Sequence, residues 1–143
     1  MSTLEKAIRI AAEAHAGQLD KAGKPYVLHC VRVMIRGSTI EENIVGVLHD
    51  VVEDTGWSCD SLRQAGFSEV VVQAVAALTR QPEMTYEEFI SQVTRNPIAR
   101  RVKLFDLEDN MDLSRLDNPT DEELLRREKY QAAYRFLKMD ERV

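Results

Sequence analysis

The fold is decided by the stretch Val45-Gly46-Val47-Leu48-His49-Asp50-Val51-Val52-Glu53-Asp54. It places one histidine and three carboxylates among residues that are otherwise apolar. In an α-helix, His49 lies one turn from Glu53, and Asp50 lies one turn from Asp54. Because valine and leucine interleave with these polar residues, such a helix has no simple solvent face and is expected to be buried.

Burial of these polar groups requires a partner, because each buried charge without one costs several kcal/mol. A divalent cation supplies that partner, since it binds imidazole nitrogen and carboxylate oxygen together. The alternative is a charged helix face in solvent, with His49 packed at its edge, and an isolated His-Asp pair would favour that alternative. The apolar flanks shift the balance toward a metal site.

Two other segments carry weaker signals of the same kind. In Val102-Lys103-Leu104-Phe105-Asp106-Leu107-Glu108-Asp109-Asn110-Met111, Asp106 and Asn110 lie one helical turn apart and can address one point. Alternatively, Asn110 caps the helix end and Asp106 pairs with a lysine. His29, in Pro25-Tyr26-Val27-Leu28-His29, is by itself more typical of a hydrogen-bonded core residue than of a ligand.

Outside these segments the sequence predicts helices throughout. Capping boxes, in which a Ser or Thr is answered by a Glu three residues later, occur at Ser2/Glu5, Thr39/Glu42, Thr85/Glu88 and Thr120/Glu123. With amphipathic periodicity they predict helices over residues 3–16, 25–35, 40–53, 60–64, 69–78, 86–94, 97–110 and 121–138. No repeat, linker or persistent strand-like alternation appears, so the expected fold is all-α, a single compact helical domain over residues 1–143.

Composition limits the classes of partner. A 143-residue chain suits one domain, and its net charge of −5 argues against a nucleic-acid binder, which needs a surplus of Lys and Arg. A small anionic substrate stays open, because a bound dication and local lysines reverse the sign within a pocket. The sequence has no signal-peptide pattern or membrane-spanning run, and Cys30 and Cys59 form no paired motif. We therefore expect free thiols, a cytoplasmic location and no membrane partner.

Four motifs in the chain resemble those of the HD-domain phosphohydrolase superfamily, and more narrowly of the single-domain hydrolases related to RelA/SpoT alarmone enzymes. The resemblance covers nearly the whole chain, and four motifs in family order are far more specific than any one. They are Ala14-His15-Ala16-Gly17-Gln18, Lys24-Pro25-Tyr26-Val27-Leu28-His29, Leu48-His49-Asp50-Val51-Val52-Glu53-Asp54-Thr55 and Val102-Lys103-Leu104-Phe105-Asp106-Leu107-Glu108-Asp109-Asn110-Met111. The resemblance implies an HD-domain fold.

The resemblance also implies site residues. The metal ligands would be His29, His49, Asp50 and Asp106. The implied ion is most often manganese, although the wider superfamily also uses iron, nickel, cobalt, magnesium or zinc. Glu53 and Asp54 match the acidic pair that positions and activates the attacking water, and which of them is the general base stays open. Asn110 matches a polar residue that borders the substrate.

Four residues at three places in the chain depart from the family pattern. Cys30 follows the first ligand histidine where the family commonly has proline, and Asp109 replaces a common histidine. Leu19-Asp20 stands where alarmone hydrolases often carry basic residues, so Lys21 is the first cation available to bind substrate. Because Asp20 would repel a pyrophosphate, the substrate is less specified than the metal site.

Two further features of the sequence have simple structural explanations. In the C-terminal segment, Tyr130 or Arg135 could line the pocket, although helix packing is the simpler interpretation. His15 is expected to be a hydrogen-bonded structural residue near the site.

The sequence therefore predicts a metal-dependent phosphohydrolase of a small phosphorylated nucleotide. The specific candidate is guanosine 3′,5′-bis(diphosphate) (ppGpp) 3′-pyrophosphohydrolase. The alternatives are a nucleoside monophosphate phosphomonoesterase and a non-catalytic module that binds metal and nucleotide. The intact pair Glu53-Asp54 argues against the last, because buried acids cost stability. The sequence does not specify an oligomeric state.

Overall fold

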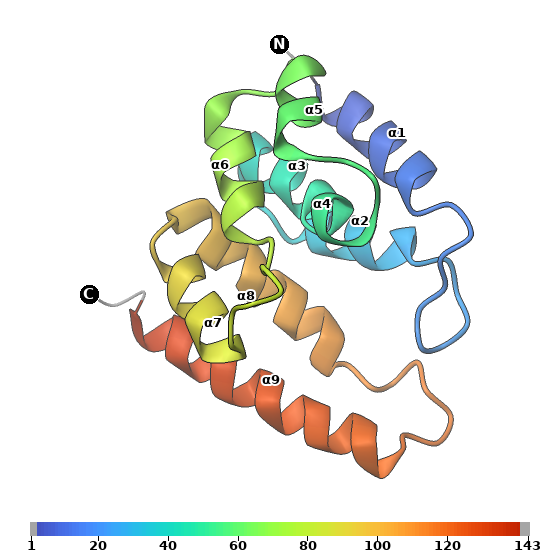
Figure 1. The fold of residues 1–143 in the computed structure, drawn as a ribbon. Helices are drawn as coiled ribbons and strands as arrows, with labels where there is room; N and C mark the ends of the chain where they lie inside the picture. The colour runs from blue at the N-terminus through green and yellow to red at the C-terminus, as the bar shows by residue number, and fades with distance from the viewer. Residues whose placement is uncertain (1–2, 141–143) are drawn as a thin grey trace.

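The computed structural model describes residues 3–140 and consists of α-helices joined by loops (Figure 1). Within this range the strand-like pairing is a single bridge between Leu19 and Pro25, so the predicted all-α class is confirmed. The helices are α1 (Leu4–Ala14), α2 (Val27–Ile35), α3 (Ile40–Leu48), α4 (Val51–Asp54), α5 (Cys59–Gln64), α6 (Glu69–Ala77), α7 (Tyr86–Thr94), α8 (Pro97–Met111) and α9 (Asp121–Asp140).

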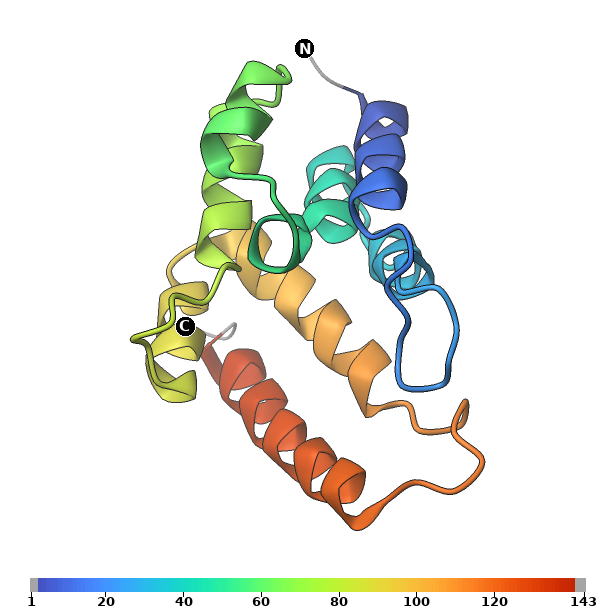
Figure 2. The ribbon, with the colours of Figure 1, turned by 45° about the vertical axis from the view of Figure 1, so that its right-hand side comes forward.

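The helix α3 lies at the centre of the fold and contacts α1, α2, α6 and α8. Figure 2 shows it between α1 and α6, with α2 beneath it. Residues 44–48 are all buried, as the apolar pattern predicted. Gly46 permits the close approach of α2, because a Cβ at this position would lie 3.0 Å from the Cα of Met34. The central helix therefore delivers its C-terminal end, with His49 and Asp50, into the interior.

Two neighbouring polar side chains near the start of α3 fix it to other helices. Asn43 donates from Nδ2 to the carbonyl oxygens of Met34 and Gly37, at 2.8 and 3.1 Å, and so closes the end of α2. Glu42 is buried and pairs with Arg101 of α8 at 3.2 Å. These contacts hold α3 against α2 and α8, the two helices that carry the other candidate ligands.

The predicted helix starts are confirmed in large part. Thr85/Glu88 and Thr120/Glu123 are reciprocal capping boxes, and an unpredicted one joins Ser58 and Ser61. Thr39 caps α3, but the Glu42 carboxylate accepts from Ser38 instead of answering Thr39. Thr3 caps α1 by accepting from Lys6, while the predicted Ser2 lies outside the described residues.

Two predicted helix boundaries are wrong. The second helix begins at Val27, because Pro25 is held in the bridge to Leu19 that closes the 15–26 loop. The predicted helix over 40–53 is interrupted at His49 and Asp50, where Asp50 has φ −104° and ψ 0°. His49 donates from Nδ1 to the Gly46 carbonyl oxygen at 2.6 Å, and this oxygen is the acceptor that a continuing helix would use.

The C-terminal half supplies the remaining walls of the site. The helices α8 and α9 run antiparallel and pack against each other (Figure 1). The loop that joins them, residues 112–120, lies at the same end of the molecule as the 15–26 loop in both views (Figures 1 and 2). Along residues 3–140, no helix combines the length and apolarity needed to cross a membrane.

Candidate metal centre and substrate cavities

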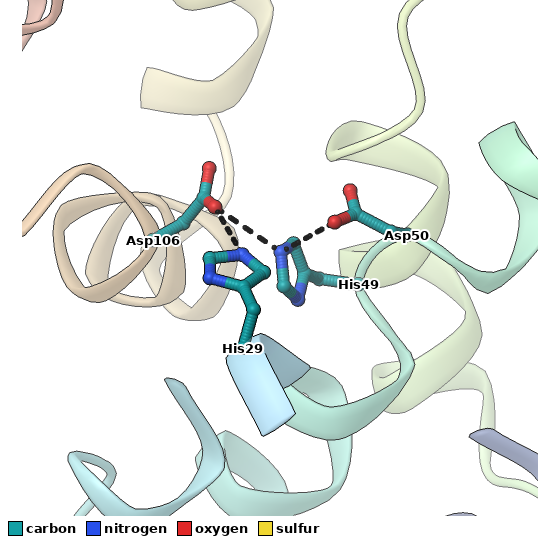
Figure 3. Close-up of side chains that lie close together, drawn as sticks. All are labelled: His29, His49, Asp50 and Asp106. Carbon is teal, nitrogen blue, oxygen red and sulfur yellow. Dashed lines mark hydrogen bonds and ion pairs between the residues drawn. The ribbon is translucent and has the colours of Figure 1, made fainter. Parts of the chain in front are cut away.

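Four side chains from three parts of the chain meet at one point (Figure 3). His29 comes from α2, His49 and Asp50 from the break between α3 and α4, and Asp106 from α8. One ligand-type atom from each lies within 4.8 Å of the others. Nε2 of His29 is 2.9 Å and Nε2 of His49 is 3.3 Å from the same oxygen of Asp106. The structure thus brings together the four residues that the sequence singled out.

The donor atoms of this cluster fit a divalent transition metal. Nδ1 of His49 faces the Gly46 carbonyl oxygen, which can only accept, so Nδ1 carries a hydrogen and the neutral ring turns the lone pair of Nε2 toward the cluster. Nε2 of His49 is also 3.0 Å from an oxygen of Asp50. Two imidazole nitrogens and two carboxylate oxygens, nearly shielded from water, are a ligand set that such ions accept.

Acidic neighbours favour protonation of both histidines of the cluster. Burial opposes protonation of His49, but Asp50 and Asp106 raise its pKa well above the ordinary 6.5. Burial likewise opposes protonation of His29, whose pKa is nevertheless raised by hydrogen bonds to Asp106 and Asp109. Both shifts favour the protonated rings, whose hydrogens a bound cation would have to displace.

Asp106 also makes the lysine pair that was the alternative to a ligand role. One of its oxygens faces the histidines, while the other is 2.7 Å from Nζ of Lys103. Burial alone would raise the pKa of Asp106, but Lys103 and the two histidines hold it well below its usual range. Asp106 thus contacts both Lys103 and the two histidines, so its pairing with a lysine does not take it out of the cluster.

The acidic pair after the cluster is placed differently from the prediction. Glu53 and Asp54 are exposed, because α4 is one turn long and buries only its inner residue Val51. Glu53 accepts from the backbone N–H of Arg80 at 2.7 Å and lines the cavity beside the cluster. Asp54 accepts from Gln18 at 3.4 Å and does not line that cavity. Partial burial, followed by the charge of Asp50, raises the pKa of both acids.

A cavity of about 200 Å³ opens beside the cluster, and its wall carries three cations (Arg80, Lys103, Lys129) and three acids (Asp50, Glu53, Asp106). Arg80 and Lys129 lie over the ring of Tyr86, at 5.8 and 3.9 Å from its centroid. Tyr130 of α9 also lines the cavity, whereas Arg135 does not. We refer to this space as the metal-side cavity; its other polar lining residues are His49, Asp50, Glu53, Lys103, Asp106 and Asn110.

A second cavity of about 200 Å³ lies between the 15–26 and 112–120 loops, and we call it the loop-side cavity. Lys21 lines this second space, and Asn110 borders both cavities. Asp20 is turned inward to its own loop, where one oxygen accepts from the backbone N–H groups of Ala22 and Lys24 at 2.9 Å each. The charges along the wall balance, with three cations (Lys21, Arg32, Arg115) and three acids (Asp20, Asp109, Asp112).

Comparison with known proteins finds similar sequences among curated bacterial proteins. No family model matches it. It is 30% identical over 118 residues to a guanosine-3′,5′-bis(diphosphate) 3′-pyrophosphohydrolase of Aquifex aeolicus, with 76% of this chain and 17% of that protein covered. It is 32% identical over 116 residues to the protein of the same name from Haemophilus influenzae, with 71% and 17% covered. A GTP pyrophosphokinase of Streptomyces coelicolor is 29% identical over 121 residues, with 76% and 14% covered.

The fold comparison points the same way. A solved structure of a metazoan orthologue of SpoT that hydrolyses ppGpp superposes with a TM-score of 0.78. The sequence identity is 24%, and the match covers 98% of this chain and 85% of that one. The resemblance to RelA/SpoT-type HD-domain proteins is confirmed. This RelA/SpoT-like chain spans about a sixth of the length of the curated relatives that it matches.

The departures of this RelA/SpoT-like chain have different structural consequences. Cys30 is fully buried and free, which agrees with its interpretation as a small core residue. His15 is buried and hydrogen-bonded through Nδ1 to Gln18 at 2.8 Å, as expected. Asp109, by contrast, lies directly against His29, with Nδ1 and Oδ2 2.6 Å apart.

Sequence reasoning missed several residues of the site. Tyr26 donates its hydroxyl to Asp50, although only its place in the second motif hinted at a role. Arg32, which lies about one helical turn after His29, pairs with Asp109 in the wall of the loop-side cavity. Arg80 and Lys129 reach the metal-side cavity from segments where no motif was recognised, so no local signal marked them.

Proposed function

We propose that this chain is a metal-dependent phosphohydrolase that cleaves the 3′-pyrophosphate from ppGpp or a closely related nucleotide. The observation that carries this proposal is the meeting of His29, His49, Asp50 and Asp106 beside a cavity whose wall includes Arg80 and Lys129. The names of the similar proteins from Aquifex aeolicus and Haemophilus influenzae support the choice of substrate. We also propose that residues 1–143 act as one domain in the cytoplasm.

These four residues would hold one divalent ion, for which we propose manganese. When bound, such an ion supplies a Lewis acid for the phosphoryl oxygens and lowers the pKa of a bound water. His29 and His49 present Nε2 to the cluster, and each keeps Nδ1 on a hydrogen-bond acceptor. The protein thereby orients both rings before an ion arrives.

Glu53 is the proposed general base. It lines the metal-side cavity, and its carboxylate is fixed by the backbone N–H of Arg80 at 2.7 Å. Its pKa is raised by partial burial and by Asp50 and Asp54, which favours acceptance of a proton from water. Asp54 lies outside that cavity and, in this proposal, tunes Glu53 by its charge.

The two cavities would hold different parts of the substrate. Arg80 and Lys129 would bind the pyrophosphate at the metal-side cavity, where a bound ion would add its positive charge to theirs. The loop-side cavity has balanced charge, which suits the uncharged nucleoside better than a second pyrophosphate. Asn110 borders both cavities and would contact the ribose between them, while Lys21 at the exposed loop would meet the 5′-phosphates.

The test is product analysis with purified protein. Manganese-loaded protein would be given ppGpp, and chromatography should show GDP and pyrophosphate in equal amounts as water is consumed. His49→Ala is the control for contaminating activity. A nucleotide panel would run alongside ppGpp. Failure to release phosphate or pyrophosphate from any nucleotide above the His49→Ala level would overturn the enzyme proposal.

A phosphomonoesterase is the second candidate, and the balanced charge of the loop-side cavity favours it, since no surplus cation there awaits a 5′-diphosphate. Such an enzyme would release orthophosphate and leave a nucleoside. A non-catalytic binding module is a third possibility, because Glu53 and Asp54 are exposed and their retention no longer implies a cost in stability. Calorimetric nucleotide binding without any product would identify that case.

A further inference from the structure

A buried carboxylate stands behind the first histidine of the cluster. The side chain of Asp109 is 1% exposed, and its Oδ2 lies 2.6 Å from Nδ1 of His29. The other ring nitrogen of His29 lies 2.9 Å from Asp106. Both ring nitrogens of His29 therefore contact a carboxylate, with Nε2 facing the proposed metal position and Nδ1 facing away from it.

Two arginines hold Asp109 in this position. Nε of Arg32 is 2.7 Å from Oδ1, and Nη2 of Arg32 is 3.2 Å from Oδ2. Nη2 of Arg115 approaches Oδ2 at 3.6 Å from the 112–120 loop. The two contacts with the Arg32 guanidinium mark Asp109 as a carboxylate anion, which only accepts hydrogen bonds.

A purely structural ion pair would need only the contact between Arg32 and Asp109. The short contact between Asp109 and His29 is not needed for such a pair, and it affects the histidine ring. Because Asp109 accepts, Nδ1 of His29 must carry the hydrogen, and deprotonation of Nε2 then leaves its lone pair directed at the cluster. His49 obtains the same tautomer from the neutral carbonyl of Gly46, so only His29 has an anionic support.

We propose that Asp109 is a positioning residue for the metal centre. It fixes the tautomer and orientation of His29 and makes Nε2 a stronger donor, while Arg32 and Arg115 keep the carboxylate in place. This inference rests on the proposed metal centre but not on hydrolysis. At this position the resembled family commonly has histidine, so the arrangement distinguishes this chain.

Metal affinity measured by calorimetry tests the role. Asp109→Asn should weaken Mn²⁺ binding by roughly 10- to 100-fold, the range found when outer partners of metal ligands are lost. Asp112→Asn is the matched control, because Asp112 lines the same cavity and pairs with the same Arg115 at 3.5 Å, yet is exposed. The control should change affinity by less than about 2-fold, within the usual scatter of surface substitutions. Equal affinities of the two variants would overturn the proposal.

A second measurement needs no variant and so does not depend on the stability of Asp109→Asn. Long-range ¹H–¹⁵N spectra of protein loaded with diamagnetic Zn²⁺ report which nitrogen of His29 carries the hydrogen. The expected state is Nδ1 protonated and Nε2 metal-bound, and the reverse assignment would overturn the proposal. If these results hold but no nucleotide is hydrolysed, only the proposed function fails. If hydrolysis occurs and Asp109→Asn binds metal like wild type, only the positioning role of Asp109 is wrong. If the wild-type protein binds neither Mn²⁺ nor Zn²⁺, both the positioning role and the proposed function are wrong.

Discussion

Nε2 of His29 lies 2.9 Å from Oδ1 of Asp106, although the two residues are 77 positions apart in the chain. The contact joins α2 to α8 at the point where both pack on the central α3. Asp106 also carries the buried pair with Lys103. A substitution at Asp106 therefore affects the metal cluster and the packing of these helices together.

Asp106→Ala should remove metal binding and destabilise the metal-free protein by roughly 3–5 kcal/mol, because Lys103 keeps a buried charge without its partner. The double variant Lys103→Met/Asp106→Leu removes both charges and should recover most of that loss. Urea unfolding measures both effects. A single variant as stable as wild type would show that the pair is dispensable.

Metal binding should release protons from the two histidines. Neighbouring carboxylates raise the pKa values of both rings in the metal-free protein, which favours the protonated forms, and a cation must displace those hydrogens to reach the nitrogens. Calorimetric titrations of Mn²⁺ in two buffers of different ionisation enthalpy would give different apparent heats, and affinity should rise with pH. Identical heats in the two buffers would contradict this prediction.

The stability of the metal-free protein should decline as pH rises above neutrality. The raised pKa values of His29 and His49 contribute stability that is fully present below 6.5 and is lost as pH passes their folded values. Asp106 and Asp109 have lowered pKa values, and their contribution is present above 3.8 and lost as pH falls. Thermal unfolding in EDTA should therefore show a maximum at mildly acidic pH. Saturating Mn²⁺ should reverse the decline at higher pH, and a metal-free midpoint that keeps rising there would rule out this account.

Glu53→Gln should lower kcat by about 10²- to 10⁴-fold, the usual contribution of a general base. Its affinity for Mn²⁺ should change little, because Glu53 is not among the four clustered residues. Asp54→Asn should have the smaller effect, since Asp54 does not line the metal-side cavity. Steady-state kinetics on both variants measure kcat. A larger fall in kcat for Asp54→Asn would make Asp54, and not Glu53, the general base.

Gly46→Ala should destabilise the fold by about 1–3 kcal/mol, as overpacking does in tight cores. The new Cβ would lie 3.0 Å from Cα and 3.2 Å from N of Met34, and backbone atoms cannot move aside as a side chain can. Gly56→Ala is the control, since its Cβ would meet nothing within 4 Å. Because Gly46 also anchors His49, the first variant should bind Mn²⁺ more weakly than the second.

Helical periodicity and caps predicted most of the fold, because both are local properties of the chain. The break at His49 escaped prediction for a physical reason. The apolar pattern continues through it, and the interruption depends on a side-chain bond to the Gly46 carbonyl that competes with the backbone. The exposure of Glu53 and Asp54 was also missed, because no local pattern tells which face of a one-turn helix remains uncovered.

The order of the motifs identified the four clustered residues, whereas their supports were not visible in the sequence. Asp109 and His29 are 80 positions apart, and nothing in the intervening chain indicates that they touch. Arg80 and Lys129 enter the cavity only because α7 and α9 pack beside α8. Such residues become functional through tertiary contact, which single-sequence patterns do not encode.

The four clustered side chains come from three segments of the chain, and His29 and Asp106 are 77 positions apart, so an ion held by them would act as a cross-link. Like a disulfide, it would close a loop of the chain and restrict the unfolded ensemble, but it could be withdrawn without any change in redox state. Ligands that bind only the folded form stabilise it by a free energy that rises with the logarithm of their free concentration. Resistance of this protein to proteases would then follow the supply of metal, and a shortage of the ion would shorten its lifetime as well as empty its site.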